Sequence, residues 1–228
     1  MLAVTDLAGT LLGRLDADFS VRRDPERAAA MAAYMRDQFE YFGLAAPAVR
    51  AVERSAFAGL PRPTADDLRA VTLGCWERDE REFQYAACDY LRKFVSAADP
   101  GFVPVLRTLI TTKSWWDTVD PLATRVTGDL VRAHPALVGT MDAWSADENM
   151  WLVRTALLFQ LHYGEATDTE RLFEYCARQA GHRDFFVRKA IGWALRHYAR
   201  TDASAVRAFV ETTPTLSGLS RREAMKHL

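Results

Sequence analysis

The stretch Trp151-Leu152-Val153-Arg154-Thr155-Ala156, which leads to His162-Tyr163, returns 35 residues later as Phe186-Val187-Arg188-Lys189-Ala190-Ile191, which leads to His197-Tyr198. A related stretch, Phe83-Gln84-Tyr85-Ala86-Ala87, lies close to two periods further upstream. Helix-pair repeats of the HEAT type have a comparable period. Stacked helix pairs form a solenoid whose concave face is an extended binding surface. The repeat therefore predicts an all-α protein, a HEAT-like α-solenoid with a concave face, as a single domain over residues 1–228.

Helix start signals support this fold class. Asp24-Pro25-Glu26-Arg27 combines a capping acid, a proline at the first helical position and an early glutamate. The apolar spacing that follows predicts a helix through Phe39 that stops near Gly43. Thr64-Ala65-Asp66-Asp67 and Ser145-Ala146-Asp147-Glu148 predict two further helix starts. Runs of β-branched residues between Gly-Asn or Asp-Gly turns are absent, so strands are not expected.

Composition narrows the class of protein. The chain has 228 residues, 49% hydrophobic and 26% charged, with a formal net charge of −1. This balance excludes a uniformly basic nucleic-acid binder, although a locally basic face remains open. Cys75, Cys88 and Cys176 lack paired metal-ligand spacing, and we expect buried thiols in a reducing compartment. Met1 to Leu15 has neither signal-peptide nor membrane-span character, so a cytoplasmic protein without a membrane partner is expected.

The segment Lys113-Ser114-Trp115-Trp116-Asp117-Thr118-Val119-Asp120 has the clearest chemical character. If it is one helix, Trp116 and Asp120 lie four residues apart and are side-chain neighbours. An indole face and a carboxylate together suit a positively charged guest. The alternative is structural, with both indoles in the core and both acids, Asp117 and Asp120, at the helix N-terminus.

Three other positions have both a functional and a structural interpretation. Trp193 follows Gly192, and a mid-helix glycine indicates a groove or close helix–helix contact. Arg154 lies among apolar residues, where an arginine either reaches solvent by snorkelling or binds an inward carboxylate or phosphate bidentately. Tyr34 is either a ligand-facing residue or a half-buried tyrosine.

Searches for other catalytic motifs find none. The chain has no Gly-rich phosphate loop, no Gly-x-Ser-x-Gly and no His-Glu-x-x-His. Its histidines are scattered. His162 and His197 occupy equivalent repeat positions, which indicates a shared structural role. No metal and no cofactor are expected.

The sequence resembles the AlkD-type DNA alkylation repair enzymes, which are HEAT-repeat glycosylases of alkylated purines, over about residues 24–228. Ser114-Trp115-Trp116-Asp117-x-Val119-Asp120 and Lys189-Ala190-Ile191-Gly192-Trp193 carry the resemblance most specifically. Further matching strings include Pro25-Glu26-Arg27, Glu80-Arg81-Glu82-Phe83-Gln84, Trp151-Leu152-Val153-Arg154 and Leu219-Ser220-Arg221-Arg222-Glu223-Ala224. The chain departs from the family after Phe42-Gly43, where Leu44-Ala45-Ala46-Pro47 replaces a polar residue. That departure bears on a hydrogen bond near the lesion's partner strand.

The resemblance implies a cytoplasmic, nucleoid-associated base excision repair enzyme, a DNA-3-methyladenine/7-alkylguanine glycosylase. Its substrate would be duplex DNA with N3- or N7-alkylated purines, bound on the concave face without base flipping. The matching catalytic positions are Trp116, Asp120 and Trp193, and Tyr34 and Arg154 line the same cleft.

The chemistry of these residues agrees with that activity. An alkylated purine leaves as a neutral base, and Asp120 and the indoles could stabilise the sugar cation that forms. Candidate phosphate contacts are Lys113, Arg188, Lys189 and Arg196. No lysine is placed as a Schiff-base nucleophile, so a monofunctional, monomeric enzyme is expected. The alternatives are a non-catalytic binder of damaged DNA and a protein–protein scaffold.

Overall fold

The computed structural model describes residues 6–228, and the first five residues of the Met1–Leu15 segment lie outside it. The described chain is helical and contains no β-strand, with one isolated bridge between Glu40 and Glu80. The all-α prediction is therefore confirmed. Helix packing divides the chain into two compact units, residues 1–105 and 106–228. Packing alone does not determine whether each unit folds by itself, so the single domain stays a prediction.

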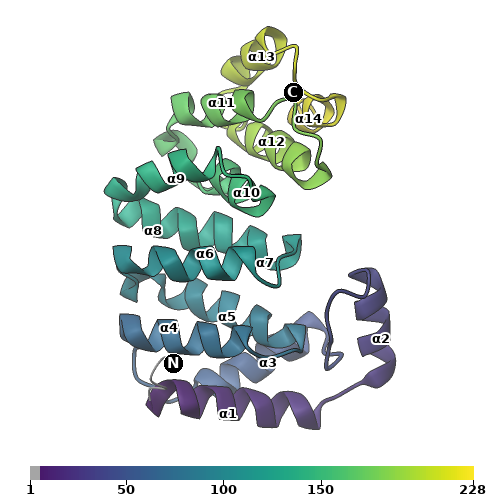
Figure 1. Cartoon of the computed structure of the whole chain (residues 1–228), viewed down its shortest axis with the longest axis vertical. Coiled ribbons are helices and arrows are strands. Elements are labelled where there is room, and N and C mark those ends of the chain that lie inside the picture. Colours follow the sequence, from purple (N-terminus) through teal and green to yellow (C-terminus); the bar gives the residue numbers. More distant parts are fainter. Residues whose placement is uncertain (1–5) are drawn as a thin grey trace. The chain divides into compact units, whose positions relative to one another are not determined.

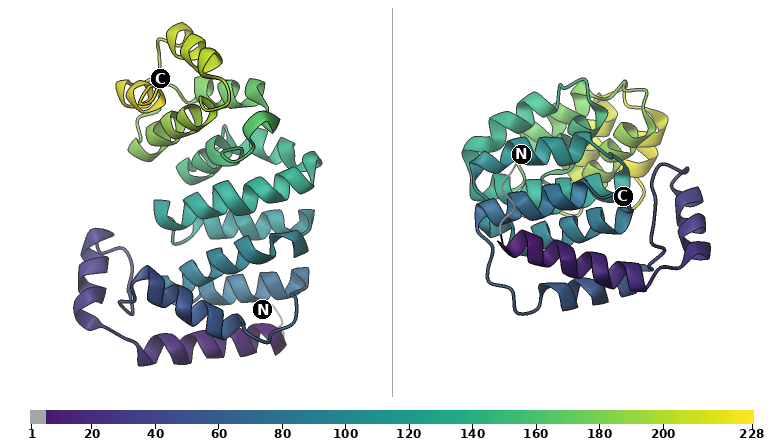
Figure 2. Two further views of the ribbon diagram at one scale, coloured as in Figure 1. Left: turned by 180° about the vertical axis from the view of Figure 1, so that it is seen from behind. Right: turned by 60° about the horizontal axis from the view of Figure 1, so that its bottom comes forward.

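The first unit contains long helices and two short 3₁₀ turns. The elements are α1 (Asp6–Val21), α2 (Pro25–Tyr34), α3 (Ala46–Phe57), α4 (Ala65–Trp76), α5 (Arg81–Phe94), η1 (Val95–Ala97) and η2 (Pro100–Phe102). α1 packs against α3 and α4, and α5 packs against α3 and α4. α2 stands apart from the other helices of this unit (Figure 1, Figure 2). It buries none of its residues.

Helix α2 is held at its two ends. Asp24 caps it, because its Oδ1 accepts the backbone N–H of Arg27 at 3.0 Å. The predicted start is confirmed, but the predicted end is wrong. The helix stops at Tyr34, and Arg36 and Asp37 adopt left-handed φ angles of 60° and 55°. Their backbone N–H groups close the last turn onto Ala33 and Ala32 carbonyls.

A buried carboxylate holds the segment after α2 against the core. Glu82 accepts backbone N–H groups from Phe42, Gly43 and Leu44 at 3.0, 2.9 and 3.1 Å. Gly43 has a φ of 96°, and a Cβ there would lie 2.2 Å from the Asp24 carbonyl oxygen. A side chain at position 43 would therefore push apart the segments that precede and follow α2.

The second unit is a stack of helices (Figure 1). Its elements are α6 (Val103–Thr111), α7 (Trp116–Pro121), η3 (Leu122–Thr127, π-helical), α8 (Gly128–Ala133), η4 (Pro135–Leu137), α9 (Val138–Trp144), α10 (Met150–Leu158), η5 (Gly164–Ala166), α11 (Thr169–Arg178), α12 (Phe185–Tyr198), α13 (Ala203–Thr212) and α14 (Gly218–Ala224). Seen from the other side in Figure 2, the same order of helices is evident.

The sequence repeat corresponds to α10 and α12, which pack against each other. Every residue of α10 from Trp151 to Leu158 is buried. A helix that is covered all round lies inside the fold, so α10 is the central helix of the second unit. The predicted start at Ser145 is wrong. Ser145 ends α9, and Asn149 caps α10 by accepting the backbone N–H of Trp151 at 2.9 Å.

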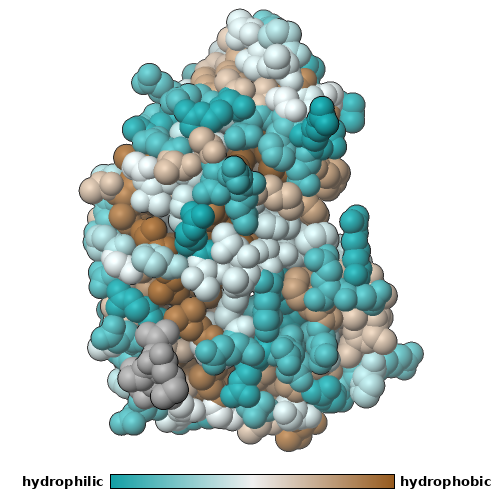
Figure 3. Space-filling model, viewed as in Figure 1, coloured by the Kyte–Doolittle hydropathy of each residue, from teal (hydrophilic) through white to brown (hydrophobic). Residues whose placement is uncertain are grey.

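Three further observations concern the cysteines, the surface and the length of the helices. Cys75, Cys88 and Cys176 are buried free thiols, as predicted. The face drawn in Figure 3 is mostly hydrophilic, with smaller hydrophobic patches between. None of the helices within residues 6–228 is long and apolar enough to cross a membrane.

Candidate active site

Helix α7 begins at Trp116 because the chain turns sharply just before it. Lys113 has a left-handed φ of 48°, and Trp115 is extended at the N-cap position. Ser114 does not cap α7; its Oγ donates to the Ile110 carbonyl at 2.7 Å and closes the end of α6. Trp116 and Asp120 therefore share one α-helix, four residues apart, as predicted.

The turn that carries Asp120 leads into a π-helical segment. Pro121 follows Asp120 directly and has no N–H to donate. Thr124 Oγ1 donates to the Asp120 carbonyl at 2.8 Å. The π-helix spans Leu122–Thr127 and continues into α8. Single π-helical turns inside α-helices occur frequently at functional sites.

The carboxylate of Asp120 is bound by a buried arginine. Arg154 Nε donates to Asp120 Oδ1 at 2.7 Å, and its Nη2 donates to Oδ2 at 2.8 Å. The arginine side chain is 5% exposed and the aspartate side chain 17%. Bidentate pairs of this kind fix both orientation and distance. The exposed part of Asp120 is thus presented in one orientation.

The same arginine ties a third helix to the site. Its Nη1 donates to the Phe186 carbonyl at 2.5 Å, in the first turn of α12. Arg154 therefore links α7, α10 and α12. Because α10 is central, Arg154 has no short route to solvent, and snorkelling does not occur. The alternative that it binds an inward carboxylate is the one observed. Its donors face Asp120 and Phe186, and its predicted contact with DNA stays a prediction.

The ionisation of Asp120 depends on its neighbours. Burial raises the pKa of the Asp120 carboxyl, hydrogen bonding and charge from Arg154 lower it, and the charge of Asp117 raises it. The net direction is upward. The guanidinium partner, which is always charged in proteins, therefore opposes the protonation that burial favours.

The two adjacent tryptophans differ in their surroundings. Trp115 packs with Trp151 and Phe186, at ring-centroid distances of 5.9 and 4.9 Å, and Trp151 and Phe186 lie 5.1 Å apart. Trp115 and Trp116 are both partly exposed, so the alternative with both indoles in the core does not hold. Asp117 Oδ1 accepts the backbone N–H of Thr118 at 3.1 Å, near the helix start.

Trp193 lies on α12, which packs against α10 and α14. The Trp193 side chain is partly exposed, as are Trp116 and Asp120, so none of the three is sealed in the core. That they border one opening stays a prediction. A Cβ on Gly192 would lie 2.3 Å from Glu223 Cβ and 3.0 Å from the Ser220 carbonyl oxygen. The structural interpretation of Gly192, close helix–helix contact, is therefore the one observed.

Two predicted phosphate contacts have a partner that the sequence did not indicate. Lys189 Nζ pairs with Glu223 Oε1 at 2.9 Å, and Arg196 Nη1 pairs with the other oxygen of the same carboxylate. The hydrogen bonds from Lys189 and then Arg196 lower the pKa of Glu223. Both cations join α12 to α14, and their contact with phosphate stays a prediction. No local pattern marks Glu223, because its partners lie 34 and 27 residues away.

The other predicted site residues are Tyr34, Lys113 and Arg188. Tyr34 ends α2 in the first unit and is 74% exposed, so it is not a half-buried tyrosine. Lys113 is half-buried in the turn before α7. Arg188 is half-buried, and its Nε donates to the Asp184 carbonyl at 3.3 Å. No group of three or more metal-binding side chains occurs within residues 6–228.

The site thus consists of a paired acid and arginine beside partly exposed indoles on an all-helical scaffold. A family profile described as "DNA alkylation repair enzyme" matches residues 15–228. The structure is also similar to a predicted DNA alkylation repair enzyme from Enterococcus faecalis, with a TM-score of 0.82 and 31% identity over 91% of this chain and 97% of that one. Among curated proteins no match is found. The chain belongs to the family of DNA alkylation repair enzymes.

Proposed function

We propose that the protein is a monofunctional DNA glycosylase that excises cationic N3- and N7-alkylated purines from duplex DNA. The bond that breaks is the N-glycosidic bond, and its electron pair goes to the purine. A water oxygen then bonds to C1′ of the deoxyribose and releases a proton. The lesion stays in the base stack, in contrast to enzymes that flip their target base. Family membership and the arrangement around Asp120 support this proposal.

The charge of the lesion explains why no general acid is needed. A purine alkylated at N3 or N7 carries a positive charge, so it leaves as a neutral base. Positive charge then develops on the sugar. Groups that stabilise charge formed in the transition state accelerate the reaction, whereas groups that bind substrate and transition state equally do not. A fixed carboxylate near the sugar therefore suits this reaction.

Asp120 is the residue that we assign to this task. A carboxylate about 4 Å from a unit positive charge contributes about 4 kcal/mol at an effective dielectric constant near 20. A guanidinium roughly 4 Å behind that carboxylate opposes about half of the attraction. The remaining stabilisation is about 2 kcal/mol, or about 30-fold in rate. Arg154 thus weakens the field of Asp120 but keeps its carboxylate ionised and oriented.

Trp116 and Trp193 are assigned to the sugar. An indole presents negative quadrupole density to a cation on its face. Trp116 is positioned with Asp120 by the shared helix α7, and Trp193 is positioned by α12, whose first turn contacts Arg154. The single observation that carries the proposal is the bidentate Asp120–Arg154 pair, one helical turn from a partly exposed tryptophan.

Base release from a duplex containing N7-methylguanine tests the proposal. We expect free base from the wild-type protein and little from a duplex containing hypoxanthine, because an uncharged base is a poorer leaving group. Asp120→Asn should release base at least tenfold more slowly while it still binds duplex, since the charge acts mainly at the transition state. Glu211→Gln, which removes an exposed acid on α13, is the matched control.

Three outcomes separate the alternatives. Binding of the damaged duplex without base release would identify a non-catalytic binder. Absence of both would favour a protein–protein scaffold. Equal rates for Asp120→Asn and wild type would remove Asp120 from the mechanism. A 2-aminopurine reporter beside the lesion should stay quenched, and a large fluorescence increase would indicate base flipping.

A further inference from the structure

Two histidines at equivalent positions of the repeat meet at the ends of α10 and α12. His162 follows α10, and His197 lies in the last turn of α12. Their ring centroids are 5.4 Å apart, with the rings perpendicular. Both rings are partly exposed. The repeat therefore places two imidazoles side by side at the surface of the second unit. Neither imidazole has a role in the proposed chemistry.

Cations surround this pair. Arg125 of η3 and Arg200 after α12 are exposed, and neither side chain forms a hydrogen bond or ion pair within residues 6–228. Arg132 of α8 donates to the His162 carbonyl at 3.1 Å and lies 4.2 Å from the Tyr163 ring. Within residues 6–228, Asp129 of α8 is the one acid among the charged groups that act on the two imidazoles. Lys189 and Arg196, in contrast, both pair with the carboxylate of Glu223.

Burial and neighbouring charges both act on the two imidazoles. For His162, burial lowers the pKa, as do Arg125 of η3 and Arg132 of α8, whereas Asp129 of α8 raises it. Burial lowers the pKa of His197, as do Arg200, His162, Arg125 and Arg196.

In both histidines the net direction is downward. Burial is the larger cause of this decrease in both histidines, and the surrounding cations add to it. An anion bound among these groups would reverse that effect.

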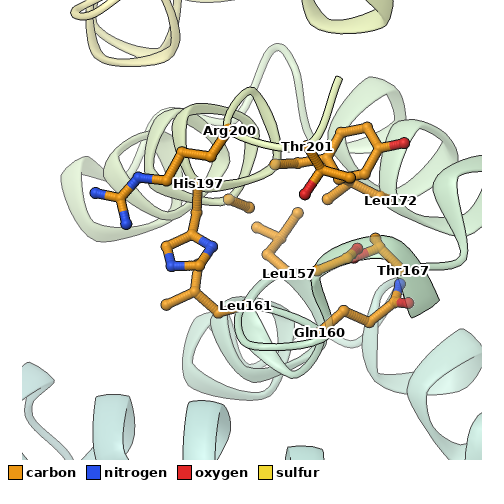
Figure 4. Close-up of a pocket in the computed structure, with 11 residues that line it drawn as sticks. Leu157, Gln160, Leu161, Thr167, Leu172, His197, Arg200 and Thr201 are labelled. Carbon is orange, nitrogen blue, oxygen red and sulfur yellow. The ribbon is translucent and has the colours of Figure 1, made fainter. Parts of the chain in front are cut away.

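A cavity of about 230 Å³ lies next to this cluster, with His197 and Arg200 together on one side and Thr167 and Leu172 opposite (Figure 4). Two of the polar side chains that line it are already hydrogen-bonded. Gln160 bonds the backbone of Asp168 through both amide atoms, and Tyr198 bonds Thr169 at 2.8 Å. His197 and Arg200 also line the cavity, and together with His162 and Arg125 they form a charged surface that extends beyond it. This favours an extended anionic partner over a small molecule in the cavity.

We infer that His162, His197, Arg125 and Arg200 form a contact site for backbone phosphates of duplex DNA, and that the two histidines take up protons when DNA binds. The inference rests on the proposed function, since it assumes that the second unit binds duplex. Guanidinium and imidazolium groups donate charge-assisted hydrogen bonds to phosphate oxygens. Such contacts position a duplex without reading its sequence.

The affinity for duplex should therefore rise as pH falls. Each histidine whose pKa increases by one unit on binding contributes up to tenfold in affinity below its pKa in the free protein. We expect undamaged duplex to bind several-fold more tightly at pH 5.5 than at pH 7.5 at constant ionic strength, measured by fluorescence anisotropy. The double variant His162→Gln/His197→Gln should lose most of this difference. His227→Gln, at an exposed site near the C-terminus, should retain it.

The arginines are tested through salt dependence. Each phosphate contact that is lost lowers the salt slope of binding by about one. The double variant Arg125→Gln/Arg200→Gln should therefore reduce that slope by about two. Arg207→Gln, which removes an exposed arginine on α13, should leave the slope unchanged. Thermal unfolding of each variant verifies that it is folded.

Histidine proton resonances distinguish the source of the phosphate. We expect the pKa values of His162 and His197 to rise when duplex is added and to stay unchanged in inorganic phosphate at matched ionic strength. An equal rise in inorganic phosphate would indicate a free-phosphate site and overturn the inference. Unchanged pKa values with duplex would also overturn it.

The two proposals fail in different ways. Normal base release together with unaltered pH and salt dependence in all cluster variants would overturn this inference and leave the glycosylase proposal standing. If the cluster variants bind duplex more weakly and the wild type releases no base, the glycosylase proposal is overturned and this inference stands. Absence of duplex binding by wild type at either pH would overturn both.

Discussion

At the scale of single residues, the pair Asp120–Arg154 combines two opposed effects. Burial makes an ionised carboxylate unfavourable, and the guanidinium offsets that penalty through two hydrogen bonds. The arginine is more buried than the acid that it supports. Its contribution to activity is therefore indirect, because it sets the protonation state and orientation of Asp120.

Replacing the arginine should move the pH dependence of base release. In Arg154→Gln the pKa of Asp120 rises, so the carboxylate needed for catalysis forms only at higher pH. We expect the acidic limb of the rate profile to shift upward, with a rate loss of at least tenfold near pH 6. Arg154→Lys keeps a charge and should retain more of the wild-type profile. A profile of Arg154→Gln that superimposes on wild type would show that Arg154 does not control Asp120.

Glu53 is a second buried acid, in the first unit and outside the proposed site. It is 4% exposed, and its Oε1 has no hydrogen-bond partner among residues 6–228. Burial, the charge of Asp89 and a hydrogen bond with Asp89 raise the pKa of Glu53 to about 8, although Arg50 and Arg92 oppose the rise. This acid is therefore protonated in the folded protein at neutral pH.

The raised pKa of Glu53 predicts a loss of stability with increasing pH. The folded state holds the proton up to about pH 8, whereas the unfolded chain releases it near the ordinary value of 4.5. The contribution of this residue to stability is thus full below pH 4.5 and is lost as pH rises through 8. Glu53→Gln should exceed wild type in free energy of unfolding by at least about 1 kcal/mol at pH 9. The difference should shrink toward pH 5 in urea unfolding curves, and a constant difference would contradict it.

At the scale of elements, the contact between α12 and α14 depends on a small residue and one acid. Gly192 allows Glu223 to approach α12, where the acid pairs with Lys189 and Arg196. The ordinary helix penalty of glycine, about 1 kcal/mol relative to alanine, is thus compensated by packing. This interface also positions the stretch of α12 that carries Trp193.

Gly192→Ala should destabilise the protein although alanine is the better helix former. The added Cβ would lie 2.3 Å from Glu223 Cβ and 3.0 Å from the Ser220 carbonyl oxygen, so backbone must move. Overpacking of this kind costs typically about 1–3 kcal/mol. Gly13→Ala is the matched control, because a Cβ on Gly13 meets nothing within 4 Å on α1. Thermal unfolding should show a lower melting temperature for the first variant and an equal or higher one for the control.

Local capping chemistry made some helix boundaries predictable. Asp24 and Thr64 cap their helices as expected, the latter in a reciprocal capping box with Asp67. The end of α2 was missed because apolar spacing continues into the loop, where Met35 is buried without being helical. The start near Ser145 was missed because Ser145, Asp147 and Asn149 all have capping side chains, and only Asn149 precedes the helix.

At the scale of the whole molecule, the sequence predicted what local spacing determines. One helix carries Trp116 and Asp120, and the 35-residue repeat predicted the paired helices α10 and α12. It left undecided whether Arg154 meets a carboxylate, because Asp120 lies 34 residues away. Glu223 was missed for the same reason. Contacts between distant residues follow from helix packing, which spacing alone does not specify.

Net charge provides the last prediction. A protein with a formal charge of −1 has no overall attraction to DNA. Binding must then come from cations sorted to one surface, and it should release counterions as phosphates are contacted. We expect the logarithm of the duplex binding constant to fall linearly with the logarithm of salt concentration, with a slope of about −0.9 for each phosphate contact. Anisotropy titrations from low to moderate salt measure this slope. A flat response would mean that no surface of this protein follows the DNA backbone, whatever its active-site residues do.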